Sequence, residues 1–350
     1  MKIVHVVGTG TIGEPLIGLL ADNREHFGID EVTFHKRTPL ITEKAKVGDL
    51  INRGAALAVD ENRRSTFEEL GHTPKYETKE AIERATVVID CTPVGNEMKE
   101  EFYNDARGPI GFMAQGSEFG FGKMYARGIN DEALAPGDRF LQIVSCNTHN
   151  MSVLVKTLGM DSDGTNHLVD GRFLCIRRAN DISQDDGFVA SPTVEGHKDE
   201  RFGTHHARDS HALFETLGYD LNLFSSALKL NTQYMHLMHF NLVLDRDITL
   251  DEVKDRLMEN TRVAVTHKKS ANQVFSFGRD HGYYGRIMSQ AVVALETLAV
   301  RNGNEVVGFS FTPQDGNPLL STVAAMLWYL DPEEMDERIN VLRRYLFSEI

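Results

Sequence analysis

Short runs of β-branched and aromatic residues recur along the first half of the chain, and a segment of helical apolar spacing follows the first run. The runs that predict strands cover residues 3–7, 31–35, 85–90, 110–114 and 140–144. The helical spacing covers residues 15–20. Strands that alternate with helices form parallel sheets. The pattern therefore predicts an α/β domain with a parallel sheet in this half.

A glycine motif separates the first predicted strand from the first predicted helix. Gly8, Gly10 and Gly13 have the spacing G-x-G-x-x-G, with Thr11 and Ile12 between the last two. In a Rossmann domain such glycines permit a tight turn, close approach of the backbone to a pyrophosphate, and close helix–strand packing. The helix N-terminus offers N–H groups to the phosphates. We expect this loop to bind a dinucleotide; a glycine-rich turn of another α/β fold is the alternative.

The second predicted strand ends in a basic sequence, His35-Lys36-Arg37-Thr38. An NAD-binding domain usually places Asp or Glu here, to accept a hydrogen bond from the ribose 2′-hydroxyl. The two cations, Lys36 and Arg37, instead suit a 2′-phosphate. We therefore expect NADP as the preferred cofactor and NAD as the second choice. A solvated basic turn without a ligand is the alternative.

A cysteine follows the last of these strands. Ser145-Cys146-Asn147-Thr148 lies between the strand at 140–144 and a second segment of helical spacing at 152–158. A helix N-terminus stabilises a thiolate, and its amides can hold an oxyanion. Asn147 and Thr148 add short polar donors. We expect Cys146 to be a nucleophile, with a buried structural thiol as the alternative.

Two histidines are candidate partners for Cys146, because histidine titrates near neutral pH. Residues 232–245 have the alternation of a strand, which places His236 on the face of the apolar Met238 and His239 on the more polar face. We expect His239 to be the partner and His236 to be the second choice. In a helix the two would share a face and suit a metal, but no further ligands stand beside them. No metal is expected.

A pair of adjacent arginines predicts an anion site in the second half. Arg177 and Arg178 end a run of strand-forming residues, and guanidinium groups match phosphate or carboxylate. His205 and His206 belong to a second polar cluster after Thr204. Ion-paired surface arginines and a solvated loop are the respective alternatives.

The chain is expected to form two domains. Residues 1–144 and 316–350 would form the dinucleotide-binding domain, and residues 145–315 an α+β catalytic domain with a mainly antiparallel sheet. Asn302-Gly303-Asn304 stands between two β-rich runs and predicts a hairpin in that sheet. Helical segments at 319–329 and 333–347 are expected to pack back on the first domain.

Composition excludes several classes of protein. The 350 residues include 51 Asp and Glu against 37 Lys and Arg, a formal charge of −14, which disfavours nucleic acid as a partner. Hydrophobic residues make up 41%, which is ordinary for a globular protein. No apolar run is long enough to span a membrane. Three cysteines without a CxxC pair, and an N-terminus unlike a signal peptide, favour a cytoplasmic setting.

The chain resembles the archaeal-type glyceraldehyde-3-phosphate dehydrogenases. The matching motifs lie at residues 8–13, 90–95, 115–116, 145–148, 177–181, 204–206, 236–239 and 314. The resemblance implies a Rossmann domain, a catalytic domain and a homotetramer, with a place in glycolysis or gluconeogenesis. It implies that Cys146 forms a thiohemiacetal with D-glyceraldehyde 3-phosphate, that a hydride passes to NAD(P), and that phosphate releases the thioester as 1,3-bisphosphoglycerate.

The resemblance also implies roles for individual residues. The cofactor-binding residues outside the glycine loop and the basic turn would be Thr92, Pro93, Gln115, Gly116 and Gln314. The residues that bind the small anionic substrate would be Asn147, Thr148, Arg177, Arg178, His205 and His206.

One departure from the family keeps other functions open. The family continues the cysteine motif with Thr-Gly, whereas this chain has His149-Asn150. The change falls where we expect phosphates to bind. An NADPH-dependent reductase of an acyl-CoA or another acyl phosphate, giving a semialdehyde, is therefore the alternative enzyme. A non-catalytic NADP-binding thiol sensor is the third hypothesis, in which Cys146 has an ordinary thiol pKa.

Overall fold

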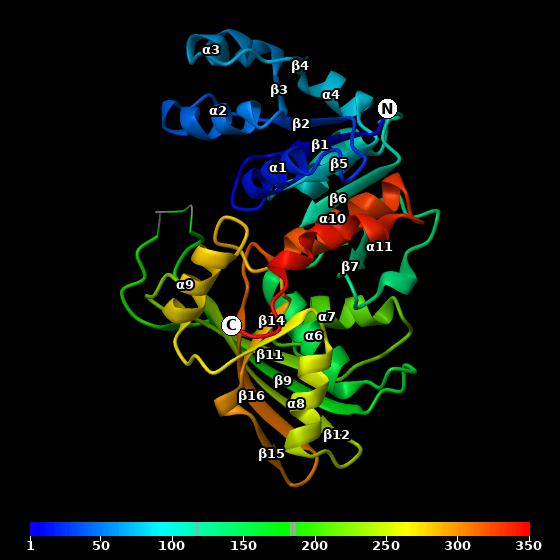
Figure 1. The fold of residues 1–350 in the computed structure, drawn as a ribbon, viewed down its shortest axis with the longest axis vertical. Coiled ribbons are helices and arrows are strands. Elements are labelled where there is room, and N and C mark those ends of the chain that lie inside the picture. The colour runs from blue at the N-terminus through cyan, green and yellow to red at the C-terminus, as the bar shows by residue number, and fades with distance from the viewer. Residues whose placement is uncertain (117, 183, 185–186) are drawn as a thin grey trace. The chain divides into compact units, whose positions relative to one another are not determined.

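The chain folds into two compact units, each built around its own sheet (Figure 1). The computed structural model describes residues 1–350 except 117, 183 and 185–186. The first unit comprises Met1–Lys123, Ala135–Ile143 and Thr322–Val341. The second unit comprises Met124–Leu134, Val144–Ser321 and Leu342–Ile350.

The first sheet has the strand order β4-β3-β2-β1-β5-β6-β8-β7. Its strands are β1 (Ile3–Val7), β2 (Glu31–His35), β3 (Ala56–Val59), β4 (Tyr76–Glu77), β5 (Val87–Asp90), β6 (Gly111–Gln115), β7 (Lys123–Tyr125) and β8 (Phe140–Ile143). From β4 to β8 every neighbouring pair runs parallel. The order reverses at β1, as in doubly wound nucleotide-binding sheets. The predicted parallel α/β architecture is confirmed.

Helices and shorter turns connect these strands. They are α1 (Gly13–Asp22), η1 (Ile41–Glu43), α2 (Lys44–Asn52), η2 (Glu61–Arg63), α3 (Arg64–Glu69), α4 (Thr78–Arg84), α5 (Gly95–Met98) and η3 (Lys99–Tyr103). Every residue of β1, β5 and β6 is buried. A parallel sheet covered on both faces buries both sets of alternating side chains, which explains why these strands read as continuous apolar runs.

The second sheet is mixed. It has the order β10-β11-β9-β12-β16-β14-β13, and β15 pairs with β16. Its strands are β9 (Leu168–Arg177), β10 (Thr193–Val194), β11 (Leu223–Lys229), β12 (His236–Leu244), β13 (Val263–Thr266), β14 (Ala291–Ala294), β15 (Ala299–Arg301) and β16 (Glu305–Thr312). The pairs β9–β11 and β13–β14 run parallel. The other pairs run antiparallel. The predicted antiparallel sheet is therefore corrected to a mixed one, because helices α7 (His205–Glu215) and α9 (Ala271–His281) carry the chain across between the parallel strands.

Helices α6 (Cys146–Gly159), α7 and α8 (Leu250–Glu259) cover one face of this sheet. Their apolar side chains share a core with Met238, Phe240 and Leu242 of β12. Helix α9 packs with Phe311 in a separate core. Short turns η4 (Asp131–Ala133) and η5 (Leu295–Thr297) complete this part. The predicted hairpin forms between β15 and β16, where Asn302 and Gly303 have φ angles of 53° and 82°.

The C-terminal region contains α10 (Asn317–Leu330), which confirms the helix predicted at 319–329, and α11 (Met335–Arg338) with the 3₁₀ helix η6 (Ile339–Tyr345), which stand in place of one continuous helix at 333–347. The division between the units differs from the expected one. Residues 124–134 join the second unit because Ile129 is buried in its core. Residues 342–350 join it too, because the chain end pairs with Val265 of β13.

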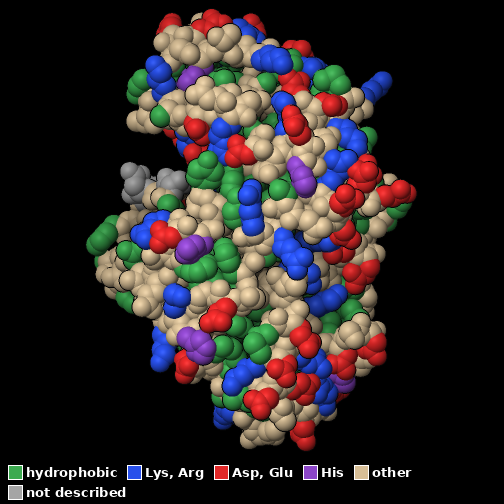
Figure 2. Space-filling model, viewed as in Figure 1, with side chains coloured by type: hydrophobic (Ala, Val, Ile, Leu, Met, Phe, Trp, Pro, Cys, Tyr) green, Lys and Arg blue, Asp and Glu red, His purple; other side chains and the backbone are tan. Residues whose placement is uncertain are grey.

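The surface is of mixed charge. Figure 2 shows Lys and Arg side chains interspersed with Asp and Glu on the face drawn, without one large basic patch. Within the described ranges, no helix has the length and apolar character needed to cross a lipid bilayer.

Candidate active site and dinucleotide site

The glycine loop between β1 and α1 is shaped by steric limits. Gly8 has a φ of +92°, a region that side chains rarely adopt. A Cβ on Gly13 would lie 2.1 Å from the carbonyl oxygen of Gly8, so only glycine fits there. A Cβ on Gly10 would meet nothing within 4 Å, so the loop is open at this point. The loop is thus tight against the protein at Gly8 and Gly13 and accessible at Gly10.

The loops after β1 and β5 meet at the point where the strand order reverses. A Cβ on Gly8 would lie 3.0 Å from Cγ2 of Thr92. Asp90 fixes this second loop, because its Oδ1 accepts hydrogen bonds from the Thr92 amide at 2.8 Å and the Thr92 hydroxyl at 2.6 Å. Pro93 follows directly. Dinucleotides bind at such a switch point.

The expected cofactor residues after β6 lie in a tight loop. Gly116 has a φ of +71°, and its amide donates to the carbonyl of Ile143 at 2.9 Å. Gln115 Nε2 donates to the Thr322 hydroxyl at 3.0 Å, so the Gln115 side chain is engaged within the unit. Ser117, which follows in the same loop, lies outside the described residues.

One lysine of the basic turn after β2 has an acidic partner, Glu43, that the sequence analysis did not identify. Lys36 pairs with the carboxylate of Glu43 at the end of η1. Arg37 and Thr38 are exposed. His35 is largely buried and lies 3.5 Å from Asp60, with its pKa lowered mainly by burial. Glu43 is six residues beyond Arg37, and no strand or helix pattern marks it.

These features fit a dinucleotide cofactor. The side chain of the N-cap residue of α1, Ile12, cannot cap the helix. The Glu14 amide donates to the Gly10 carbonyl at 3.0 Å and Pro15 has no N–H, so the Gly13 amide is the first-turn donor that would face an anion. The open position at Gly10 is where a pyrophosphate would approach Thr11 and Ile12. Lys36 and Arg37 lie at the end of the neighbouring strand, where the ribose of a dinucleotide binds in this fold.

Cys146 is the first residue of α6, a helix that begins earlier than the sequence pattern predicts. Ser145 is the N-cap, and its hydroxyl accepts from the Thr148 amide at 3.3 Å. The carbonyl of Cys146 accepts from Asn317 Nδ2 at 3.0 Å. Burial, followed by the charge of Asp315, raises the pKa of the Cys146 thiol to about 12. A thiol at this helix start would therefore need a base to become a thiolate near neutral pH.

The residues after Cys146 are turned into the protein. Asn147 Oδ1 accepts from the Thr312 hydroxyl at 3.1 Å, and the Thr148 hydroxyl contacts Ser145 at 2.9 Å. His149 Nε2 lies 2.7 Å from the Ser321 hydroxyl, and Asn150 Nδ2 donates to Thr312 at 2.8 Å. All four side chains are buried. His149 and Asn150 support the turn from behind rather than facing a ligand.

His236, the second choice from the sequence, lies on the face of β12 that α6 covers. It pairs in register with Thr312, the residue that hydrogen-bonds Asn147. Its Nδ1 accepts from the Arg178 amide at 2.9 Å, and its Nε2 lies 2.7 Å from Gln314 Nε2. Burial, with the charges of Arg178 and Arg177, holds the pKa of His236 well below its usual value. An imidazole held neutral in this way suits a proton acceptor.

His239, the first choice, lies on the opposite face of β12. The strand alternates without a bulge from His236 to Val243, as the sequence predicts. His239 stacks on Phe309 with 4.8 Å between ring centroids and lines an open hollow with Asp170, Arg172 and Asn241. The geometry therefore argues against His239 and for His236. The more polar face of the strand is not the face on which Cys146 stands.

The two arginines have different surroundings. Arg178 is buried, and its Nη2 donates to Asp181 at 3.0 Å. Arg177 is half-exposed and donates from Nη1 to Glu195 at 2.6 Å. The Nε–H groups of both are buried and have no hydrogen-bond partner in the described part of the chain. These two donors fit an anion.

His205 and His206 open helix α7, with their ring centroids 3.9 Å apart. His206 is buried, and neither ring nitrogen has a hydrogen-bond partner among the residues the structure describes. Burial, His205 and Arg177 keep the pKa of His206 well below its usual value. Two unpaired nitrogens next to Arg177 place this pair with the arginines as a candidate ligand site.

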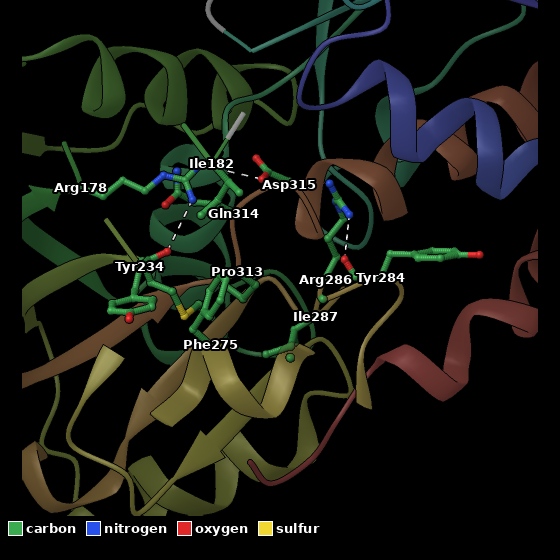
Figure 3. Close-up of a pocket in the computed structure, with 13 residues that line it drawn as sticks. Arg178, Ile182, Tyr234, Phe275, Tyr284, Arg286, Ile287, Pro313, Gln314 and Asp315 are labelled. Atoms are coloured by element: carbon green, nitrogen blue, oxygen red, sulfur yellow. Dashed lines mark hydrogen bonds and ion pairs between the residues drawn. The ribbon is translucent and has the colours of Figure 1, made fainter. Parts of the chain in front are cut away.

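A cavity of about 100 Å³ lies beside this cluster (Figure 3). Arg178 and Gln314 line it together with Asp315 and Arg286, which sequence reasoning missed. Asp315 adopts a φ of 62°, and burial raises its pKa to about 6. Asp315 lies 3.8 Å from Arg178. Only the folded chain reveals these two residues, since neither belongs to a pattern.

No group of three or more metal-ligating side chains occurs outside positions 117, 183 and 185–186. In the described part of the chain, Cys146 thus lies within electrostatic reach of Arg177 and Arg178, and His236 is hydrogen-bonded to the Arg178 backbone.

Comparison with known proteins gives one consistent result. No protein-family model matches the chain. A glyceraldehyde-3-phosphate dehydrogenase of Methanobacterium formicicum is 25% identical over 348 residues, 95% of each chain. One of Methanobacterium bryantii is 28% identical over 278 residues, 75% of this chain and 73% of its own. One of Pyrobaculum islandicum is 23% identical over 311 residues, 87% and 85% respectively. Over most of its length the chain therefore resembles the archaeal glyceraldehyde-3-phosphate dehydrogenases.

Proposed function

We propose that the chain is an NAD(P)-dependent oxidoreductase of the phosphorylating aldehyde dehydrogenase type. Its substrate would be D-glyceraldehyde 3-phosphate, oxidised to 1,3-bisphosphoglycerate, or the reverse. The observation that carries the proposal is Cys146 at the first turn of α6, with His236 and Arg178 in the same cluster. The names of the similar proteins and the glycine loop support it. Lys36 and Arg37 favour NADP over NAD as the cofactor.

Cys146 would attack the aldehyde carbon, forming a carbon–sulfur bond while the thiol proton passes to His236. The amides of the first turn of α6 would hold the oxygen of the resulting thiohemiacetal. A bound nicotinamide supplies the acceptor for the hydride that leaves this carbon. A phosphate oxygen then forms the new acyl bond as the carbon–sulfur bond breaks, and Cys146 regains its proton.

The hydrogen bonds of His236 define how it could act. Its two ring nitrogens both face N–H groups, from the Arg178 backbone and the Gln314 side chain. A neutral imidazole can accept at only one nitrogen. The ring would take the thiol proton through Nε2 in the tautomer that carries its own proton on Nδ1, which requires the bond between Nδ1 and the Arg178 amide to open and the Gln314 amide to turn away. The orphan Nε–H groups of Arg177 and Arg178, with His206, would hold the substrate phosphate.

Asn317 would contribute to cofactor binding. Its Nδ2 donates to the carbonyls of Cys146 and Gln290, at 3.0 and 3.2 Å. Its buried Oδ1 has no partner in the described ranges. An acceptor without a partner, on a side chain that donates a hydrogen bond to the Cys146 carbonyl, fits the amide group of a nicotinamide.

The experiment is turnover followed at 340 nm. Protein with NAD⁺ or NADP⁺ and D-glyceraldehyde 3-phosphate should reduce the nucleotide in a phosphate-dependent way, and Cys146→Ser should abolish this. Cys175→Ala, which removes a buried thiol of β9, is the control. The alternative reductase is tested with NADPH and either 1,3-bisphosphoglycerate or acyl-CoA thioesters. NADPH oxidation only with acyl-CoA would refute the phosphate assignment.

A second candidate is a non-catalytic nucleotide-binding thiol protein. The raised pKa of Cys146 favours it, because a protonated thiol is a poor nucleophile. This function predicts nucleotide binding without turnover of any aldehyde or acyl donor. Phosphate-dependent turnover that is lost in Cys146→Ser would exclude it.

We also propose that the protein acts as a homo-oligomer, as its similarity to the archaeal enzymes suggests. The face of the second sheet opposite α6 keeps apolar side chains partly exposed, among them Leu174, Leu237 and Phe309. Val169 on the same sheet is 51% exposed. Light scattering after size-exclusion chromatography measures the mass, and a 39.2 kDa species at micromolar concentration would contradict the proposal.

A further inference from the structure

Three charged side chains form a compact cluster beside the glycine loop. Glu43 ends η1, Lys36 follows β2, and Lys46 lies in the first turn of α2. Glu43 Oε1 lies 2.9 Å from Lys46 Nζ, and its Oε2 pairs with Lys36. The exposed fractions of the three side chains are only 13% for Lys36, 25% for Glu43 and 20% for Lys46. Solvent therefore screens these pairs less than an ordinary surface ion pair.

Lys46 connects the cluster to the dinucleotide loop. Its Nζ lies 3.4 Å from the carbonyl oxygen of Thr9, which stands between Gly8 and Gly10. It lies 3.4 Å from Glu14 in the first turn of α1 as well. Burial alone would raise the pKa of Glu43, but the two lysines hold it below its usual value. The Glu43 carboxylate is thus ionised at neutral pH, and Lys46 links it to the glycine loop that would hold the cofactor.

This arrangement differs from a simple phosphate site. A 2′-phosphate would have to take Lys36 and Lys46 away from Glu43, and it would meet the negative charge of that carboxylate. A 2′-hydroxyl would instead donate a hydrogen bond to Glu43 and leave both ion pairs in place. Arg37 is exposed, has no ion pair among the described residues, and remains as a cation for a phosphate.

We propose that Glu43 is a specificity-determining residue that accepts a hydrogen bond from the ribose 2′-hydroxyl and limits the preference for a 2′-phosphate. Lys46 is then a further cofactor-site residue, held over the loop by Glu43 and Glu14. The inference rests on the proposed dinucleotide binding. The basic turn then has a different role, because Lys36 stays in its ion pair with Glu43 unless a phosphate takes the place of that carboxylate.

The test is nucleotide binding to the full chain, measured by fluorescence of NADH and NADPH without substrate. Glu43→Gln keeps the shape and removes the charge. The ratio of the NADH dissociation constant to that of NADPH should rise at least about tenfold, since hydrogen bonds to charged groups are the strong ones. Glu61→Gln is the control, because Glu61 lies in the same unit, its side chain is 71% exposed, and it forms an ion pair with the nearby Arg64.

A measurement on the unaltered chain keeps the test independent of how the variants fold. We expect 2′-deoxy-NADH to bind about tenfold more weakly than NADH, because it lacks the hydroxyl that Glu43 accepts. Equal affinities for these two nucleotides would overturn the inference. An unchanged ratio of the NADH and NADPH dissociation constants, in a Glu43→Gln variant that keeps the wild-type melting temperature, would also overturn the inference. If the unaltered chain binds neither NADH nor NADPH, the proposed function fails first, and the two failures are distinguishable.

Discussion

Replacing Asp315 with Asn is expected to make Cys146 more reactive. Burial is the largest cause of the raised pKa of Cys146, and Asp315 is the next. Asn removes the charge with little change in shape. It also tolerates the φ of 62° that Asp315 adopts, because Asn is among the residues that enter this region most readily.

The magnitude follows from the electrostatics of a buried pair. Two unit charges several ångströms apart, in a medium of effective dielectric constant about 20, interact with an energy of about 2 kcal/mol. That energy corresponds to a fall of about 1.5 units in the pKa of Cys146. The thiolate fraction at pH 8 then rises about thirtyfold. A thiolate of lower pKa is intrinsically less nucleophilic, by about fivefold for this shift, so the net gain in rate is about sixfold.

The assay is the rate of modification of Cys146 by methyl methanethiosulfonate from pH 5.5 to 9, with the modified site identified by mass spectrometry. Asp163→Asn is the control, because Asp163 is an exposed acid of the same unit. Burial places the pKa of Asp315 at about 6, so the charge is present above this pH and lost below it. The two rates should therefore converge toward pH 5.5. Equal rates at pH 8, or an equal gain in the control, would refute the reasoning.

Three further predictions follow from the same structure. Asp315→Asn should raise the free energy of unfolding above pH 6 by about 3 kcal/mol, because a carboxyl whose folded pKa is raised about two units costs about 1.36 kcal/mol per unit once it is ionised. The gain in melting temperature should grow from pH 4 to pH 6, and a gain that does not depend on pH would contradict this prediction. His236→Asn should lower kcat/KM at least about a hundredfold, whereas His239→Asn should change it by less than about threefold; the reverse order would restore His239 as the base. Gly10→Ala should keep the wild-type melting temperature and weaken NADH binding. Gly13→Ala should lower the melting temperature and also weaken NADH binding, since of these two positions only a Cβ on Gly13 would meet backbone, at 2.1 Å. Unweakened NADH binding by Gly10→Ala would argue against the glycine loop as the cofactor site.

Much of the first unit could be predicted because its signals are local. The glycine spacing lies directly between a buried strand and a helix, and the steric contacts of Gly8 and Gly13 follow from that connection. The bounds predicted for β1 and β2 match the structure, because both are short runs that contain β-branched residues. Glu43 could not be predicted as the partner of Lys36, because their pairing depends on how the chain turns after β2.

The second unit shows where sequence patterns end. The alternation of β12 correctly separated His236 from His239, but alternation does not tell which face a helix will cover. The polar face seemed the better site from composition alone. The structure instead places α6 over the apolar face, because Leu154 and Leu158 share its core with Met238 and Phe240. A buried polar residue such as His236 on an apolar face is the signal to examine, since burial of an imidazole needs partners.

The difference from the archaeal enzymes at His149-Asn150 has a structural meaning. His149 binds Ser145 and Ser321, and Asn150 binds Thr312, so both act on the cysteine turn from inside the protein. A histidine in place of a small residue then changes how Cys146 is supported, not which anion it faces. The sequence argument for acyl-CoA as the substrate loses its basis for this reason. The choice of substrate falls instead to the unpaired nitrogens of Arg177, Arg178 and His206, which are the groups an anion would satisfy.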